Sequence, residues 1–169
     1  MLPDPFHPAI VHLPIALAVL IPGFAILGIW LISKDFLPPR SWSLIVLLQA
    51  LLLGFGWLAL ETGEDQEDRV ERVVAEQHIK SHEEAAERFL LLAGIGLLVN
   101  AAGLLPRRSG SMGRIAGTLV SLVVLAAGVS VGRLGGELVY QHGAANAYIG
   151  TAGTGSPSNP DRHFDDDDD

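Results

Sequence analysis

The sequence contains no cysteine among its 169 residues. This absence excludes disulfide bonds, thiolate metal sites, iron–sulfur clusters and the covalent attachment of c-type haem. Charged residues are scarce, at 18% of the chain, where a soluble domain carries about 25%. The net charge is −8, which leaves no basic face for binding nucleic acid. The composition therefore argues against a nucleic-acid-binding protein and against an ordinary soluble globule.

Sequence motifs of common enzymes are missing as well. The chain has no glycine-rich phosphate loop, no G-x-S-x-G motif, and no paired carboxylates inside an apolar run that would resemble a proton relay. We therefore expect an electron carrier or a subunit of a larger assembly rather than a stand-alone enzyme.

Long apolar runs are abundant. A bilayer core about 30 Å thick is crossed by about 20 residues of helix, and four runs are suitable, over residues 12–32, 42–60, 86–105 and 115–134. The predicted fold is all-α, an integral membrane four-helix bundle in one domain over residues 1–143. A disordered acidic tail is expected over residues 144–169.

Polar and aromatic side chains in these runs carry further expectations. Gln49 and Asn100 lie inside the second and third runs, where we expect them to form hydrogen bonds between helices. Trp42 and Trp57 lie near the ends of the second run and are expected at the membrane interfaces.

Lysine and arginine indicate the orientation in the membrane. The two short links, 33–41 and 106–114, hold five of the 11 bases, whereas residues 61–85 hold three bases against nine acids. The positive-inside rule places the short links in the cytoplasm. We expect a multi-pass protein of the bacterial inner membrane, with both termini and the 61–85 loop on the outer side. Residues 1–6 carry no base, so the first run is expected to remain as a span and not to be cleaved as a signal peptide.

The loop between the second and third spans is predicted to be an extra-membrane helical segment. Four-residue spacing places a series of side chains along one helical face: Val70, Val74, His78, His82 and Ala86. Ser81 and Glu84 match the S-x-x-E capping box, so the third span can begin as a separate helix near Ser81.

Glycines recur at four-residue spacing in the fourth span. Gly128, Gly132 and Gly136 form two overlapping G-x-x-x-G units, which allow another helix to approach closely. These three glycines permit a homo-oligomer without requiring one, and Gly113 and Gly117 extend the same pattern.

Five of the six histidines are expected at the outer face. They are His7, His12, His78, His82 and His142. Imidazole is the commonest protein ligand for transition metals, and haem iron accepts one imidazole on each face. Two histidines on different helices suit a haem between them, whereas His78 and His82, four residues apart, suit a single metal ion.

Other roles for these histidines stay open. His7 and His142 also suit interfacial side chains that meet water, and the pair His78 and His82 suits solvated positions on a polar helix. His12 lies inside the apolar run, where a polar group needs a partner.

Charged residues at the same depth could support a cofactor. Arg88 and Arg133 are candidates to pair with haem propionates, and Glu83 and Glu137 are candidates to orient ligand histidines. Arg133 and Glu137 are also four residues apart, which favours a local ion pair.

Three segments together resemble a bacterial family of predicted membrane proteins, domain of unknown function 2231. They are His7-Pro8-x-x-Val11-His12-x-Pro14, His82-Glu83, and Gly135-Gly136-x-Leu138-Val139-Tyr140-x-x-Gly143. The resemblance covers roughly residues 5–143. It implies a four-helix membrane domain, sometimes joined to redox modules, and it makes His12, His82 and His142 candidate ligands without supplying an activity.

The function predicted from these observations is a haem b-binding, cytochrome-like electron-transfer protein or a respiratory-complex subunit. His12 and His82 are the first-choice axial ligands, and His142, His7 and His78 are alternatives or a second pair. A zinc or copper site formed from His12, His78, His82 and His142 is one alternative, and a non-catalytic accessory subunit is another. The expected partners are membrane lipid and other membrane or periplasmic redox subunits.

Overall fold

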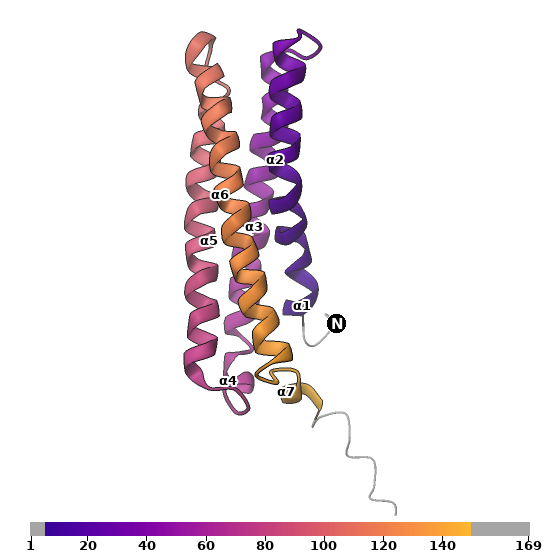
Figure 1. Ribbon diagram of the computed structural model, residues 1–169, viewed down its shortest axis with the longest axis vertical. Coiled ribbons are helices and arrows are strands. Elements are labelled where there is room, and N and C mark those ends of the chain that lie inside the picture. Colours follow the sequence, from indigo (N-terminus) through magenta and orange to yellow (C-terminus); the bar gives the residue numbers. More distant parts are fainter. Residues whose placement is uncertain (1–5, 150–169) are drawn as a thin grey trace, which may run out of the picture.

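The computed structural model describes residues 6–149 of the chain, which form helices joined by short turns (Figure 1). The elements in chain order are α1 (His7–Ile10), α2 (His12–Ser33), the 3-10 helix η1 (Pro39–Trp42), α3 (Ser43–Glu64), α4 (Glu67–Val70), α5 (Glu76–Ala102), α6 (Arg107–Tyr140) and α7 (Asn146–Ile149).

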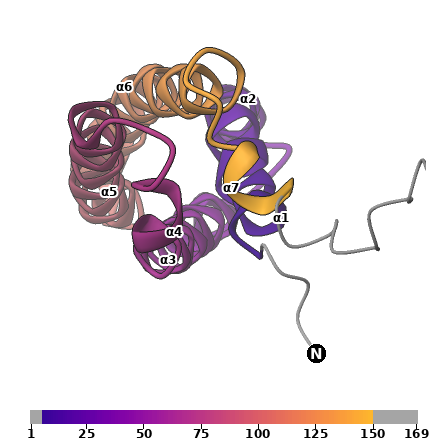
Figure 2. The same ribbon diagram turned by 90° about the horizontal axis from the view of Figure 1, so that it is seen from below.

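The four long helices form an up-down-up-down bundle. Helix α2 packs against α3 and α6, and α5 packs against the same two helices, so the four close into a ring (Figure 2). The helices α1, α4 and α7 lie together at one end of this ring, which we call the α4/α7 end (Figure 1). The opposite end, where α2 joins α3 and α5 joins α6, is the link end.

The four helical segments are long and apolar enough to cross a membrane, with mean hydropathies between 1.5 and 2.6. Large apolar side chains point outward along them, as Leu91 and Leu98 do with 66% and 74% of their surface exposed. A soluble protein rarely exposes such continuous apolar surface, whereas a helix facing lipid does. The predicted all-α four-helix membrane fold is confirmed.

The helices extend beyond the predicted runs. The first begins at His7, because Pro8 suits the first turn of α1, and α2 then continues through Pro22 to Ser33. Helix α5 runs unbroken from Glu76, so the separate start predicted near Ser81 is wrong: the Ser81 hydroxyl donates to the Gln77 carbonyl inside the helix.

The predicted helical segment between the second and third spans is confirmed, with one interruption. Within residues 61–85, α3 continues to Glu64, α4 covers Glu67–Val70 and α5 begins at Glu76. The chain turns through residues 71–75, and the extended Ala75 leads into α5. Within the predicted tail, Ala144 is buried and α7 is helical. The tail from residue 150, with its terminal acids, lies outside the described residues.

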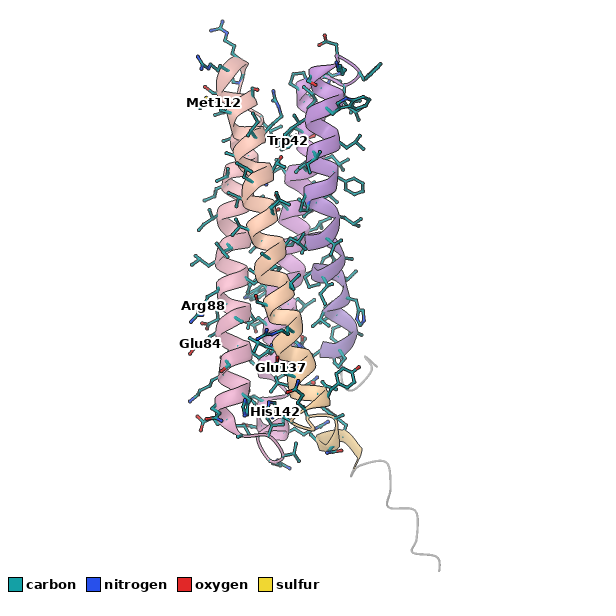
Figure 3. The ribbon with its side chains drawn as sticks, viewed as in Figure 1. Trp42, Glu84, Arg88, Met112, Glu137 and His142 are labelled. Carbon is teal, nitrogen blue, oxygen red and sulfur yellow. The ribbon has the colours of Figure 1, made fainter. Side chains whose placement is uncertain are left out.

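The hydrophobic core fills the middle and the link half of the bundle. Its buried members are Ala18, Ile21, Ala25, Trp42, Ile45, Leu52, Phe89, Ala93 and Val124. The prediction for Trp42 is wrong: this side chain is only 1% exposed, and its Nε1 donates to the Asn100 carbonyl at 3.0 Å (Figure 3). The helical turn η1 carries the indole inward, whereas Trp57 is 58% exposed.

Buried amides join the helices across this core. The Gln49 side chain of α3 donates to the Ala93 carbonyl of α5 at 3.1 Å, and the Asn100 amide donates to the Ser121 hydroxyl of α6 at 3.3 Å. The predicted hydrogen bonds between helices are therefore confirmed.

Glycines let α5 and α6 approach each other near the link end. A side chain at Gly113 would overlap the Ala102 backbone, and one at Gly117 would overlap Asn100. In the other half of α6, Gly128 faces Phe89 and Ala18, while Gly132 and Gly136 have only open space over them. The G-x-x-x-G glycines thus lie on the inner side of this fold, and contact between two chains through them stays a prediction.

Candidate functional site

A cavity of about 930 Å³ occupies the half of the bundle nearest the α4/α7 end. Its inner limit is formed by Ala18, Gly56, Phe89 and Leu125, and its wall on α6 continues to Tyr140. From Leu125 to Tyr140 the helix advances by 15 residues, which corresponds to a length of about 22 Å. The hydrophobic core therefore ends near Phe89 and Gly128, and the cavity extends from there toward the α4/α7 end.

Short helices stand at the mouth of the cavity. Residues of α4 and α7 contribute to its lining, and Figure 2 shows α4 beside α3 and α7 beside α1 and α2 at this end of the ring. The Tyr148 hydroxyl donates to Gln66 Oε1 at 2.7 Å, and the Arg69 guanidinium lies 5.2 Å from the Tyr148 ring. These contacts hold α7 against the chain around α4.

His7 projects from α1 into the cavity lining and is anchored to α3. Its Nδ1 lies 2.8 Å from the Ala59 carbonyl and 3.3 Å from the Thr62 hydroxyl, which itself donates to the Ala59 and Leu58 carbonyls. A carbonyl only accepts, so Nδ1 carries the proton and Nε2 keeps its lone pair. The ring also lies against Gly63, where a Cβ would stand 3.2 Å from Cε1.

His82 projects from α5 into the same cavity and is anchored to α6. The Val131 carbonyl accepts a hydrogen bond from its imidazole, while Nδ1 is buried without a partner. This imidazole is close enough to that of His7 for the two to interact electrostatically.

His12 is the third histidine of the cavity lining. It begins α2 and is exposed, and it forms no hydrogen bond or ion pair with any part of the chain that the structure describes. The structure thus brings together His7, His12 and His82, from three helices.

The two remaining histidines of the predicted site lie apart from the cavity. His78 and His142 stack on each other, with ring centroids 3.8 Å apart and planes 17° apart. Neither contributes to the cavity lining, and Figure 3 shows His142 at the α4/α7 end. The i, i+4 pair His78 and His82 is therefore divided between two places.

The predicted basic partners of a cofactor also lie elsewhere. Arg88 pairs with Glu84 at 2.9 Å, and Arg133 pairs with Glu137 at 3.3 Å, with about three quarters of each arginine side chain exposed. Figure 3 shows Arg88 and Glu84 on the outer side of α5. Neither arginine lines the cavity. The local Arg133–Glu137 ion pair is confirmed, and Glu137 is engaged in it.

Acidic side chains line the cavity instead. Glu64, Glu67 and Glu83 contribute to its wall, and among residues 6–149 no lysine or arginine does. Burial raises the pKa of the Glu67 carboxyl, and the nearby negative charge of Glu83 adds to this effect. The mouth of the cavity therefore repels anions.

No group of three or more histidine, aspartate or glutamate side chains within residues 6–149 is placed to hold a metal ion. The groups that orient the half-buried imidazoles of His7 and His82 are main-chain carbonyls and glycines, for which the sequence pattern predicted no such role. Only Gly135 carried a signal, as part of the family motif after the fourth span: a Cβ there would stand 3.1 Å from Cε1 of His82.

Four helices able to span a membrane, closed around a histidine-lined cavity, define this chain as a multi-pass membrane protein. A family model described as "Predicted membrane protein (DUF2231)" matches residues 3–148, and the chain belongs to this family. The family that the sequence resembled is thereby confirmed. No curated protein and no solved structure matches the chain.

Proposed function

We propose that this protein binds haem b in the cavity, with His7 and His82 as the axial ligands, and that it transfers electrons in the membrane. The observation that carries the proposal is the pair of imidazoles on α1 and α5. Each ring is bound to a main-chain carbonyl, Ala59 for His7 and Val131 for His82, which leaves a second ring nitrogen of each available as a ligand.

This arrangement is typical of histidines that bind metals. A second hydrogen bond from the ring fixes its tautomer and orientation and raises the basicity of the ligating nitrogen. Bundle helices that face each other are a recurrent place for a cofactor held by side chains from both. The proposal replaces His12 by His7 as the partner of His82, since His12 is exposed and unanchored.

The surroundings suit a porphyrin with its carboxylates in water. The inner walls are formed by apolar side chains such as Val11, Leu125 and Val131, which favour a flat apolar macrocycle. Since no base lines the cavity in the described chain, we expect haem propionates to extend past the α4/α7 end into water. Arg88 and Arg133 are not expected to bind them.

The location proposed for the site follows from the distribution of bases. The short links carry five of the 11 lysines and arginines, so we propose that the link end faces the cytoplasm of a bacterial inner membrane. The histidines, the cavity mouth and both termini then lie on the outer side. Electron exchange there would involve other membrane or periplasmic redox subunits.

A second candidate function is the binding of a transition-metal ion such as zinc or copper. The acidic lining by Glu64, Glu67 and Glu83 favours this candidate, because it attracts a cation and repels the two propionates of haem. Of the four histidines predicted for a metal, only His12 and His82 share the cavity, and His7 lines it as well. We expect a metal site to use His7, His82 and a carboxylate after side-chain rearrangement.

A reduced-minus-oxidised spectrum of the full-length protein, purified in detergent after expression with added haem precursor, tests the proposal. We expect a b-type spectrum from the wild type. His7→Ala and His82→Ala should each lose the spectrum of a six-coordinate haem, whereas His78→Ala, the matched control outside the cavity, should keep it.

Two results would overturn the haem proposal. The first is the absence of a Soret band in the wild type despite adequate haem supply. The second is a spectrum that His7→Ala and His82→Ala leave unchanged. Stoichiometric zinc or copper without porphyrin, measured by elemental analysis on the same sample, would favour the metal-ion function.

A further inference from the structure

The wall of the cavity is incomplete between α2 and α6. Ile15 and Val19 of α2 line the cavity, yet 49% and 56% of their surfaces are exposed, and Val129 of α6 lines it with 64% exposed. On α6, the space over Gly132 and Gly136 is empty within 4 Å of a Cβ position. The two helices meet at Ala18 and Gly128, and towards the α4/α7 end the cavity opens sideways between them.

This opening faces the membrane. Ile15, Val19 and Val129 lie within helical segments that are apolar enough to span a bilayer. Arg133 and Glu137 are the first charged side chains after Arg114 along α6, so they mark the level where hydrocarbon gives way to headgroups and water. The opening therefore extends from the interface into the hydrocarbon, and a molecule dissolved in the bilayer can reach the cavity without crossing water.

His12 stands at the interfacial end of the opening. His12, Ile15 and Val19 follow the spacing i, i+3, i+7, so they lie along one face of α2. This imidazole has no partner among the described residues, and one of its nitrogens carries a hydrogen in the neutral form. The head of a ligand that enters here thus meets one hydrogen-bond donor, His12, and its chain meets the apolar side chains of Ile15 and Val19.

Charge decides which head can bind beside His12. Glu64, Glu67 and Glu83 line the same cavity, and within residues 6–149 no base does. The phosphate of a phospholipid and the carboxylate of a fatty acid would be repelled, whereas a neutral head with carbonyl acceptors would not. An isoprenoid quinone is a membrane-soluble molecule with both features, a neutral head with carbonyl acceptors and a long apolar chain.

We propose that an isoprenoid quinone enters the cavity from the bilayer between α2 and α6, with a ring carbonyl accepting a hydrogen bond from His12. Its chain lies along Ile15, Val19 and Val129, over the open surface of Gly132. This inference goes beyond the proposed haem function and does not depend on it, because it uses His12 and the lateral opening and not the pair His7 and His82.

The test measures quinone bound to the full-length protein in nanodiscs of neutral phospholipid that contain a defined isoprenoid benzoquinone. Bound quinone is extracted from the affinity-captured discs and compared with that in empty discs. Gly132→Leu fills the opening, and Gly54→Leu is its matched control, since Gly54 also has nothing within 4 Å but lies outside the cavity. His12→Leu removes the donor, and His12→Gln restores one.

We expect the wild type and Gly54→Leu to enrich quinone in the discs, and Gly132→Leu to bring it down to the level of empty discs. His12→Leu should weaken binding by about tenfold, the effect of one hydrogen bond of about 1.4 kcal/mol, and His12→Gln should recover part of it. No enrichment by the wild type, or equal enrichment by Gly132→Leu and Gly54→Leu, would overturn the proposal. So would an extract in which phospholipid alone is enriched.

The haem spectrum is recorded on the same discs and separates the two proposals. Loss of the Soret band with quinone still bound would contradict only the haem function. A normal haem spectrum without quinone enrichment would contradict only this inference.

Discussion

The imidazole of His82 lies against the backbone of Gly135, with Cε1 only 3.1 Å from where a Cβ at residue 135 would stand. A histidine on α5 and a glycine on α6 thus fit each other, and Val131, one turn earlier on α6, accepts the hydrogen bond from the same ring. The backbone of α6 determines where His82 points.

Gly135→Ala should displace the His82 imidazole by a few tenths of an ångström. We expect haem affinity to fall by about tenfold, or 1.4 kcal/mol, because axial ligation depends on the position of the ring. Haem titration of the purified apoprotein measures this change. Gly94→Ala is the control, since nothing lies within 4 Å of its Cβ position and it lies outside the cavity lining. Equal affinities of the two variants would contradict the role given to Gly135.

Glu67 should make the stability of the protein depend on pH. Its pKa is raised in the folded chain by burial and by neighbouring carboxylates. The contribution of Glu67 to folding is therefore most favourable below the ordinary glutamate pKa of about 4.3, and it is lost as the pH rises through the folded-state value.

Glu67→Gln removes this titration. The variant should gain in Tm relative to the wild type between about pH 4 and 6, by about 1 °C because the site is well solvated. Thermal unfolding in detergent across this range measures the gain. Glu87→Gln, which changes a carboxylate of α5 outside the cavity lining, is the control. A wild type that becomes more stable than the Glu67 variant as the pH rises would refute the assignment.

Trp42 should be the tryptophan that stabilises the fold. Trp42→Ala empties a buried site and removes one of the two donors to the Asn100 carbonyl, the other being the Gly103 N–H, so we expect a loss of about 3–5 kcal/mol of unfolding free energy. Trp57→Ala, at an exposed position of the same helical segment, should change it by about 0.5 kcal/mol or less. Denaturant unfolding in mixed micelles compares them. Similar losses in both variants would mean that Trp42 is not buried.

Glycines on α6 should differ in their tolerance of a methyl group. Gly117→Ala would force the Asn100 side chain aside, and we expect a loss of about 1–3 kcal/mol. Gly132→Ala fills empty space and should stabilise the helix by up to about 1 kcal/mol. The same unfolding measurement tests both. A destabilising Gly132→Ala would indicate that another helix packs on Gly132.

The sequence predicted the fold well because apolar runs of membrane length are a strong local signal. It also predicted the hydrogen bonds of Gln49 and Asn100, since a buried amide in a membrane needs a partner. The prediction for Trp42 was wrong because the run alone does not show that η1 turns the indole into the bundle.

The sequence predicted the candidate site less well. His78 and His82 share a helical spacing, yet one stacks on His142 and the other lines the cavity. Which histidines meet depends on how far each helix rotates and where it begins, and these are set by packing across the bundle. The partners of the half-buried imidazoles of His7 and His82 are the carbonyls of Ala59 and Val131. A sequence does not show which main-chain carbonyl faces a ring.

The hydrophobic core occupies the middle and the link half of the bundle, and the large cavity occupies the other half, so the change falls within single helices. On α6, Val124 is buried in the core, whereas Leu125 already lines the cavity. In the half of α6 that lines the cavity, fewer buried side chains pack against the helix, so we expect α6 to bend more easily there. Amide hydrogen exchange along α6 should therefore be slow on the link side of Val124 and faster toward Tyr140. A ligand bound in the cavity should slow exchange in the half of α6 toward Tyr140.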